Sequence, residues 1–396
     1  MSGTVPSSAL RVGSRTWQAL YNNAGGLQRR CLSSSTPRQA VHVVTFTKSA
    51  SPELQEILDT IREKIILPSY LPEDQRKRLY NHKYKKQLQV DPITLEIDGQ
   101  LHKFKYVDMM RDLPNTHDVV TRALNAMKTP SDFANLPRLL EGVCSQAHRK
   151  LNGSLYPKMV RRAAMADCLT VVIDCAKQVK RTGFKLDSSE TINELLVWIQ
   201  KGAIDSNWDK KTTQKALKRT QQILDLLEED ENHQPKEEVA VSRAFPFYRD
   251  PQMLAARLHM AAALAVKHHG GKDLDGGLVA KYAQELVQLW PEETGLLELH
   301  PTIAYADSRE GMRYLLERNG FVWYASPILS GLRMAAQVVE PELAQQLKKR
   351  AAAVGDELQT ALAVARKSHS TQRGVALYNK LFNPQASSEV AATEEA

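Results

Sequence analysis

The feature that most constrains the fold is the helical spacing of apolar residues between Tyr156 and Asp187. From Pro157, whose missing N–H is tolerated in the first turn of a helix, apolar residues fall three or four positions apart; they are Met165, Leu169, Val172, Ala176 and Val179. We expect Gly183 to end this helix and a second helix to begin at Ser188 or Ser189, with an inner face formed by Thr191, Ile192, Leu195, Leu196 and Ile199. The pattern predicts an amphipathic helical hairpin, which needs neighbouring helices to cover its apolar stripes.

Similar helical patterns occur on both sides of this hairpin. Before it they span 52–67, 73–86 and about 117–127, followed by a helix that Ser131 can cap; after it they span 251–268, 278–289, 309–319, 341–367 and 374–382. The exception is 93–106, where Ile93–Ile97 and Leu101–Tyr106 alternate across the turn sequence Asp98-Gly99 and predict a β-hairpin. We expect Pro68 to end the first helix. The predicted fold is all-α, an irregular array of antiparallel helical hairpins (a degenerate α-solenoid) with one small β-hairpin near 93–106.

Charge divides the chain into regions. An acidic run from Asp225 to Glu238, with Pro235 inside it, cannot bury much apolar surface and is typical of a flexible linker. We therefore predict a basic helical-hairpin domain at 52–228, an acidic linker at 229–243 and an alanine-rich helical domain at 244–382. A disordered acidic tail is expected at 383–396.

The first 40 residues contain five arginines and no carboxylate, because the first acidic residue is Glu53. This composition is typical of a mitochondrial transit peptide, with a cleavage point between Leu32 and Ser33; a disordered basic tail is the alternative. The most apolar run, Gly320–Gly331, contains Pro327 and is far shorter than the ~20 residues that a spanning helix needs, so no membrane span is predicted.

Basic residues are concentrated in one part of the chain. Between Arg138 and Arg219 there are sixteen Lys or Arg against eight Asp or Glu, an excess that equals the formal charge of the whole chain, +8. A second dense run follows Pro72, with Tyr80 and Tyr84 interleaved at helical spacing. Such residues suit contact with RNA phosphates, which we favour for the run after Pro72; solvated helix faces and helix-dipole interactions are the alternative explanation of such runs. The candidate RNA contacts are Arg76, Lys77, Arg78, Lys83, Lys85, Lys86, Arg149, Lys150, Arg161, Arg162, Lys180, Arg181, Lys210, Lys211, Lys218 and Arg219.

No catalytic signature is recognisable in the sequence. Nucleophile elbow, zinc-protease, EF-hand, dinucleotide-binding and kinase motifs do not occur, and the four cysteines form no CxxC pair. The stretch His268–Gly277, with two histidines, two aspartates and four glycines, could in principle hold a metal or a phosphate, but a helix cap and loop is the simpler interpretation. We expect a non-enzyme with no cofactor, no metal and no small-molecule substrate.

Two resemblances bear on function. Cys175–Asp187 resembles the end of the second helix of a pentatricopeptide-type unit, but Leu186 stands where that motif has proline and no second copy follows about 35 residues on, so a one-base-per-repeat RNA code is not expected. The arginine-rich leader, the hairpin sequence at 91–99, the Lys-Thr-Pro-Ser-Asp-Phe-Ala-Asn-Leu-Pro sequence at 128–137 and the helical array together resemble a fungal small-subunit (37S) mitochondrial ribosomal protein of the helical-repeat, pentatricopeptide-like type.

This resemblance implies a structural protein of the mitochondrial matrix that supports translation, with small-subunit rRNA and mitoribosomal proteins as partners. Two alternatives remain open. One is a free RNA-binding mitochondrial expression factor, such as a translational activator or an RNA-stability protein. The other is a respiratory-complex assembly factor that binds protein and no RNA.

Overall fold

The structure, a computed structural model, describes residues 43–97, 99–235, 237, 243–273, 276–306, 311–367 and 372–383. The predicted transit peptide, its cleavage point at Leu32–Ser33 and all but the first residue of the predicted acidic tail lie outside the described residues.

The first helical segment continues beyond Pro68, so our prediction that this proline ends it is wrong. It consists of α1 (Pro52–Ile61), the π-helical turn η1 (Arg62–Ile66) and α2 (Leu67–Ser69). In the π turn the Leu67 N–H donates to the Arg62 carbonyl, which changes the hydrogen-bond register just before the proline that has no N–H to donate.

The basic segment after Pro72 is two helices and not one. Asn81 adopts an extended conformation (φ −92°, ψ 119°) and its Oδ1 accepts the Lys83 N–H at 3.0 Å, a local bond that competes with helix continuation. The elements are α3 (Glu73–Tyr80), the 3₁₀ turn η2 (His82–Tyr84) and α4 (Lys85–Val90). The single helix predicted over 73–86 is therefore wrong.

The predicted β-hairpin is confirmed. Strands β1 (Ile93–Ile97) and β2 (Gln100–Phe104) pair antiparallel, from Ile93 opposite Phe104 to Ile97 opposite Gln100, which leaves a two-residue loop. Gly99 has φ +75°, the left-handed conformation that such a loop requires.

Helix α5 (Thr116–Ala126) follows the hairpin and is capped by Asn115. The next helix is capped by Thr129, in a reciprocal capping box with Asp132, so the prediction of Ser131 as the cap is wrong. Pro130 explains the difference, because proline is favoured at the first helical position and places the cap immediately before itself. The elements here are α6 (Pro130–Phe133), α7 (Leu136–Leu140) and the π turn η3 (Glu141–Gln146).

The first helix of the predicted 156–187 hairpin is interrupted, so its prediction as one helix is wrong. It consists of α8 (Leu155–Met165), α9 (Leu169–Lys177) and α10 (Val179–Thr182). Asp167 adopts φ +55° in the turn between α8 and α9, and Met165, expected in the core, is 66% exposed. Aspartate is one of the few residues that tolerate this conformation. Apolar residues resume their spacing of three or four positions after it, so the sequence pattern does not show the turn. Gly183 ends α10 at φ +68°, as predicted.

Helix α11 (Ser189–Asp205) begins after the Ser188 cap and buries all five predicted inner residues. Helix α12 (Lys210–Glu229) continues through Asp225, because Ile223, Leu224 and Leu227 face the core, and the 3₁₀ turn η4 (Glu231–His233) follows. His233 is buried, and its Nδ1 accepts the Leu186 N–H at 3.0 Å. The expectation that the acidic run lacks order is thus wrong as far as residue 233; the division into domains at 229–243 stays a prediction.

Most C-terminal helices lie where the sequence predicts them. After η5 (Phe247–Arg249) these are α14 (Pro251–His268), α15 (Leu278–Leu289), α18 (Pro341–Ala365) and α19 (Arg373–Phe382). The helix predicted over 309–319 is wrong, because the described part holds the 3₁₀ turn η6 (Arg313–Leu316), preceded by the short α16 (Thr302–Ala306). The missed helix is α17 (Arg318–Ala335), which carries Pro327 inside it and is buried on all sides, so it shows no amphipathic stripe.

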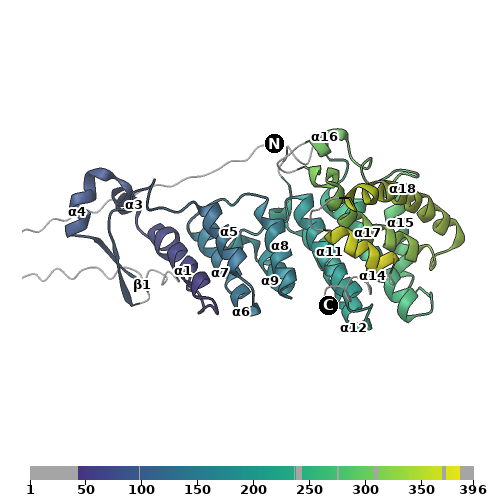
Figure 1. Cartoon of the computed structure of the whole chain (residues 1–396), viewed down its shortest axis with the longest axis horizontal. Helices are drawn as coiled ribbons and strands as arrows, with labels where there is room; N and C mark the ends of the chain where they lie inside the picture. The colour runs from purple at the N-terminus through teal and green to yellow at the C-terminus, as the bar shows by residue number, and fades with distance from the viewer. Residues whose placement is uncertain are drawn as a thin grey trace, which may run out of the picture. The chain divides into compact units, whose positions relative to one another are not determined.

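Helices α1, α5, α8 and α11 pack side by side in chain order, and α12, α14 and α15 continue the series (Figure 1). Helix α17 packs against α14, α18, α19 and α11. One hydrophobic cluster contains residues from Val44 to Tyr378, and a second, smaller one lies beneath the β-hairpin. The prediction of a mostly helical fold with one small β-hairpin is confirmed for the described residues. No helix among those described has the length and apolar character to cross a membrane.

Candidate nucleic-acid interface

The first group of predicted cations lies on α3, η2 and α4. Arg78, Lys83, Lys85 and Lys86 are exposed, whereas Arg76 is half-buried. Lys77 is exposed but forms an ion pair with Glu73 (2.7 Å), and the two groups shift each other's pKa values, that of Glu73 downward and that of Lys77 upward. Because the chain bends at Asn81, these cations form two sets on different helices.

The tertiary structure brings a distant cation to this group. Burial raises the pKa of Tyr80 on α3, and the positive charges of Arg149 and Arg76 both act against that shift. Arg149 follows the π turn η3, 73 positions away in sequence from Arg76. Arg149 and Lys150 are exposed and form no ion pair in the described chain. Cations from two separate sequence predictions thus both act on Tyr80.

Besides Lys77, four of the predicted cations have partners within the described chain. Arg161 binds the buried carboxylate of Glu194 (3.1 Å) and Arg181 lies 3.6 Å from Glu141. The guanidinium of Arg162 donates to Asn125 Oδ1 (3.3 Å), and that of Arg219 to Thr170 Oγ1 (2.5 Å). These side chains are less available to an outside anion than are cations without such a partner.

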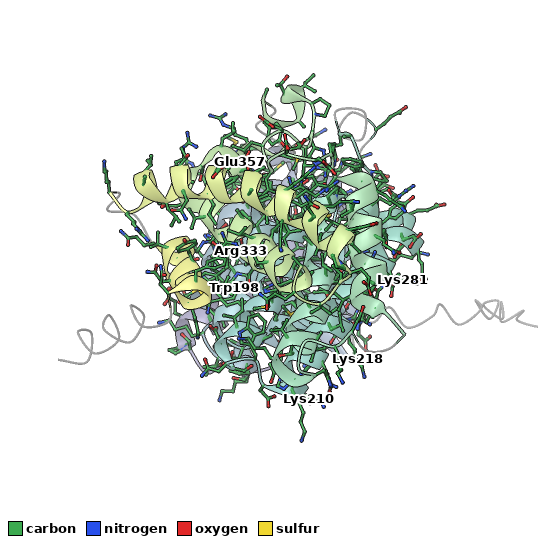
Figure 2. The ribbon with its side chains drawn as sticks, turned by 90° about the vertical axis from the view of Figure 1, so that its right-hand side faces the viewer. Trp198, Lys210, Lys218, Lys281, Arg333 and Glu357 are labelled. Atoms are coloured by element: carbon green, nitrogen blue, oxygen red, sulfur yellow. The ribbon has the colours of Figure 1, made fainter. Side chains whose placement is uncertain are left out.

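Helix α12 carries the third group at its beginning. Lys210 and Lys211 occupy its first two positions, where the positive end of the helix dipole disfavours cations by ~0.3–1 kcal/mol each. By contrast, Arg162 and the pair Lys180-Arg181 lie in last turns, where the dipole favours them. Lys210 and Lys218 both lie on the outer side of the chain (Figure 2). The helix-dipole explanation of the basic pairs therefore fails for Lys210 and Lys211.

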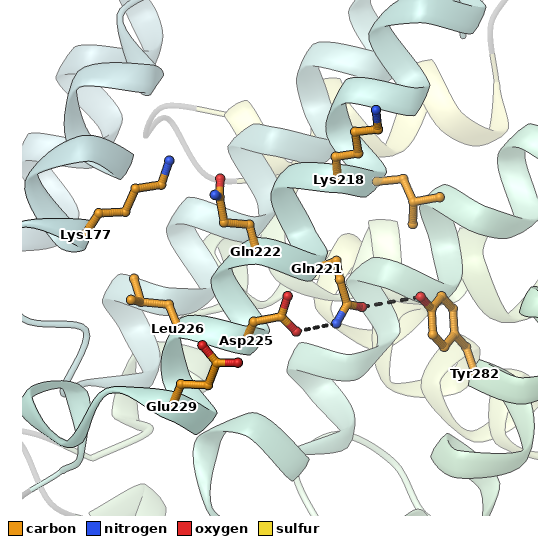
Figure 3. Close-up of a pocket in the computed structure, with 9 residues that line it drawn as sticks. Lys177, Lys218, Gln221, Gln222, Asp225, Leu226, Glu229 and Tyr282 are labelled. Atoms are coloured by element: carbon orange, nitrogen blue, oxygen red, sulfur yellow. Dashed lines mark hydrogen bonds between the residues drawn. The ribbon is translucent and has the colours of Figure 1, made fainter.

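The groove beside α12 has a mixed character. It measures about 530 Å³, and its lining includes Lys177, Lys218, Asp225, Glu229 and Tyr282. The two lysines lie toward one end and the two carboxylates toward the other, with Gln221 bonded to both Asp225 and Tyr282 (Figure 3). The carboxylates would repel a phosphate over part of the groove, so the groove as a whole does not suit an anion.

The described part of the glycine-rich stretch after α14 forms helix-end contacts of the kind that the cap-and-loop interpretation expects. His268 contacts the Trp208 carbonyl through Nε2 (2.6 Å), and the Asp273 carboxylate accepts the N–H groups of Val279 (3.0 Å) and Ala280 (2.8 Å) at the start of α15. Gly270 and Gly271 have positive φ angles. Within the described ranges, no three His, Cys, Asp or Glu side chains gather as metal ligands would.

Comparison with known proteins decides the family. A family model described as mitochondrial ribosomal protein mS27 matches residues 30–380. The chain belongs to the mS27 family. The small ribosomal subunit protein mS27 of Neurospora crassa is 45% identical to it over 383 residues, which cover 92% of this chain and 95% of that protein.

Membership of the mS27 family confirms the resemblance to fungal small-subunit mitochondrial ribosomal proteins. It also confirms the expectations of a mitochondrial protein and of a structural protein that is not an enzyme. The sixteen candidate RNA contacts stay predictions.

The sequence interpretation missed one aromatic residue beside the cations of α4, Tyr106. It lies under the ammonium of Lys85, 5.6 Å from the ring centroid, and beside His82, with the two ring centroids 6.0 Å apart. The hairpin itself contained the signal. Pairing of Ile93 with Phe104 brings residue 106 back to the chain that leads into β1.

Proposed function

We propose that this chain is held in the mitochondrial small ribosomal subunit, in the matrix, by contacts between its exposed cations and rRNA phosphates and by contacts with neighbouring ribosomal proteins. The cations expected to carry the RNA contact are those that are exposed and lack a carboxylate partner, chiefly Lys83, Lys86, Lys150, Lys210 and Lys211. Exposed ammonium groups bind phosphates by charge and release counterions, so the interaction weakens as salt rises.

The observation that carries this proposal is the position of Lys210 and Lys211. Two cations at the positive end of α12 oppose the helix dipole, and the Asp209 carboxylate at the cap offsets this only in part and only for Lys211, so the dipole does not account for the pair. An anionic partner does account for them, because their charges stay in water and within reach of a polyanion. Membership of a ribosomal protein family supports rRNA as that polyanion.

The test is a charge-reversal variant in which Lys83, Lys86, Lys210 and Lys211 are all replaced by Glu. Its sedimentation is compared with that of the wild type on sucrose gradients of mitochondrial lysate. We expect the variant to leave the small-subunit fraction for the top of the gradient, and far-UV circular dichroism to stay unchanged. Lys77 is omitted from the set because Glu73 already neutralises it.

The matched control replaces four exposed lysines of the C-terminal helices and loops by Glu, with the same change of charge: Lys272, Lys281, Lys348 and Lys367. The control should sediment with the small subunit. Wild-type sedimentation of the first variant, or equal loss of both, would contradict the proposal. A wild-type chain outside the subunit fraction would favour a free expression factor, and a salt-insensitive protein partner would favour an assembly factor.

A further inference from the structure

Three aromatic residues accompany the exposed cations of α3 and α4: His82 and Tyr106, whose rings are in contact, and Tyr84, which lies near Arg78; we call these three the aromatic cluster. The rings of His82 and Tyr106 meet edge to face, with an interplanar angle of 86°. Helices α3 and α4 and the β-hairpin lie together at one end of the described chain (Figure 1). The aromatic cluster is therefore formed by two segments that are separated by a hairpin.

The position of the cluster is held by the backbone and by the small core beneath it. The Val107 N–H, one residue after Tyr106, donates to the Leu79 carbonyl at 3.1 Å. Leu79 and Phe104 are both buried in the same hydrophobic cluster. The two tyrosines are half-buried, so part of each side chain reaches solvent.

A cation already lies over each tyrosine ring. The Arg78 guanidinium is 5.7 Å from the centroid of Tyr84, and the Lys85 ammonium is 5.6 Å from that of Tyr106. These distances are near the outer limit of a cation–π contact, and both cations are exposed, so the contacts are weak. A flat ring with greater stacking energy can replace them, and the displaced cations then remain available to a phosphate.

The surroundings suit a nucleic acid and not an acidic peptide of fixed shape. No Asp or Glu occurs from Gln75 to Val90, while six Lys or Arg do. Cations interleaved with aromatic rings are the combination by which proteins hold single strands, because every base has a face that can stack. A duplex keeps its base faces inside its own stack and cannot use the rings.

We propose that the aromatic cluster stacks against an unpaired base of a single-stranded RNA segment while Arg78, Lys83 and Lys86 hold the adjoining phosphates. This inference rests on the proposed function, since it adds base stacking to the phosphate contact. The cluster therefore distinguishes a looped or bulged strand from a helix, a distinction that charge alone does not make.

The experiment uses the full chain and synthetic RNA probes of about 12 nucleotides, a length suited to one single-strand binding surface. The probes are a single strand, the same strand paired with its complement, and a strand of equal length without bases. The variants are Tyr84→Leu/Tyr106→Leu, which removes the rings, Tyr84→Phe/Tyr106→Phe, which keeps them, and Lys83→Glu/Lys86→Glu. Tyr248→Leu is the control at a half-buried tyrosine whose surroundings contain three carboxylates and two arginines.

We expect the wild type to prefer the single strand over the strand without bases. The leucine variant should lose about tenfold in affinity for the single strand and nothing for the strand without bases. The phenylalanine variant and the Tyr248 control should bind as the wild type does, and the glutamate variant should weaken binding to all three probes.

An unchanged leucine variant would overturn the stacking proposal, and so would a leucine variant that loses equally on every probe, because a structural defect does not discriminate between them. Either result leaves the proposed function intact if the glutamate variant still weakens all binding. If the glutamate variant binds as the wild type does, the phosphate contact fails. Circular dichroism of each variant shows whether the helices remain folded.

Discussion

Replacement of Glu194 by Gln is the most informative test of how the helices are held together. The Glu194 carboxylate on α11 is fully buried and accepts five hydrogen bonds. Oε1 accepts from Arg161 Nε (3.1 Å), Trp198 Nε1 (3.1 Å) and Arg373 Nη1 (2.7 Å), and Oε2 accepts from the Tyr324 hydroxyl (2.6 Å) and Arg373 Nη2 (3.3 Å). The donors come from α8, α11, α17 and α19, so one side chain links four helices.

The magnitude follows from what glutamine cannot do. The amide oxygen of glutamine can take the place of Oε1. Its NH₂ group then faces the Tyr324 hydroxyl and Arg373 Nη2, which are donors and need an acceptor. Arg161 and Arg373 also lose the negative charge that balances theirs. Removal of one partner of a buried ion pair costs ~3–5 kcal/mol. Because Arg161 and Arg373 remain 38% and 28% exposed, water replaces part of the loss, and we expect the lower end, about 3 kcal/mol.

The assay is urea unfolding followed by circular dichroism. With a slope of about 3 kcal/mol per M, the midpoint should fall by roughly 1 M. The control is Glu190→Gln, one turn earlier on α11: burial and the neighbouring Glu194 raise the pKa of Glu190, so removal of its charge should cost no stability. Equal midpoints for wild type and Glu194→Gln would refute the reasoning, as would an equal loss in Glu190→Gln.

The difference in stability between wild type and Glu194→Gln should also depend on pH. Burial raises the pKa of Glu194, but Arg373, the Tyr324 hydroxyl and Arg161 outweigh it and place the pKa below the ordinary 4.5. The stability that this carboxylate contributes is complete above pH 4.5 and is lost as pH falls through the lower pKa of the folded state. The difference between wild type and Glu194→Gln should therefore shrink in acid.

Two further predictions concern stability. Gly374→Ala should lower the free energy of unfolding by ~1–3 kcal/mol, because the new Cβ would lie 2.8 Å from the Trp323 backbone nitrogen. Gly202→Ala, at an open position inside α11, should raise the free energy of unfolding by ~0.5–1 kcal/mol. A higher urea midpoint for Gly374→Ala than for Gly202→Ala would contradict both predictions. Burial lowers the pKa of His259 from 6.5 to about 3, so its contribution to stability is complete above pH 6.5 and is lost as pH falls toward 3. His259→Gln should flatten the pH dependence of unfolding by up to ~1.4 kcal/mol per pH unit in that window, and equal slopes would contradict a neutral His259.

The chain's own chemistry predicted most elements whose signals are local. Ser188, Gly183 and the Asp98-Gly99 turn mark their boundaries by hydrogen bonding or backbone freedom within a few residues, and α14 and α15 begin and end where their patterns do. Some errors arose from local signals that were misjudged, as at Asn81, Pro130 and Asp167, and one arose where distant packing outweighs a local signal. Helix α17 continues through Pro327 and is covered by other helices on all sides. Its sequence therefore shows no amphipathic stripe, and its proline suggests a helix end that the structure does not have.

Among the candidate contacts, the sequence by itself determined which residues carry charge and how strongly the basic residues concentrate before residue 220. Only the tertiary structure decided which of these charges are available. It placed Arg161 on the buried Glu194, brought Arg149 to α3 and set Tyr106 beside Lys85. The physical reason is that charge belongs to a side chain, whereas exposure and pairing depend on neighbours that only folding provides.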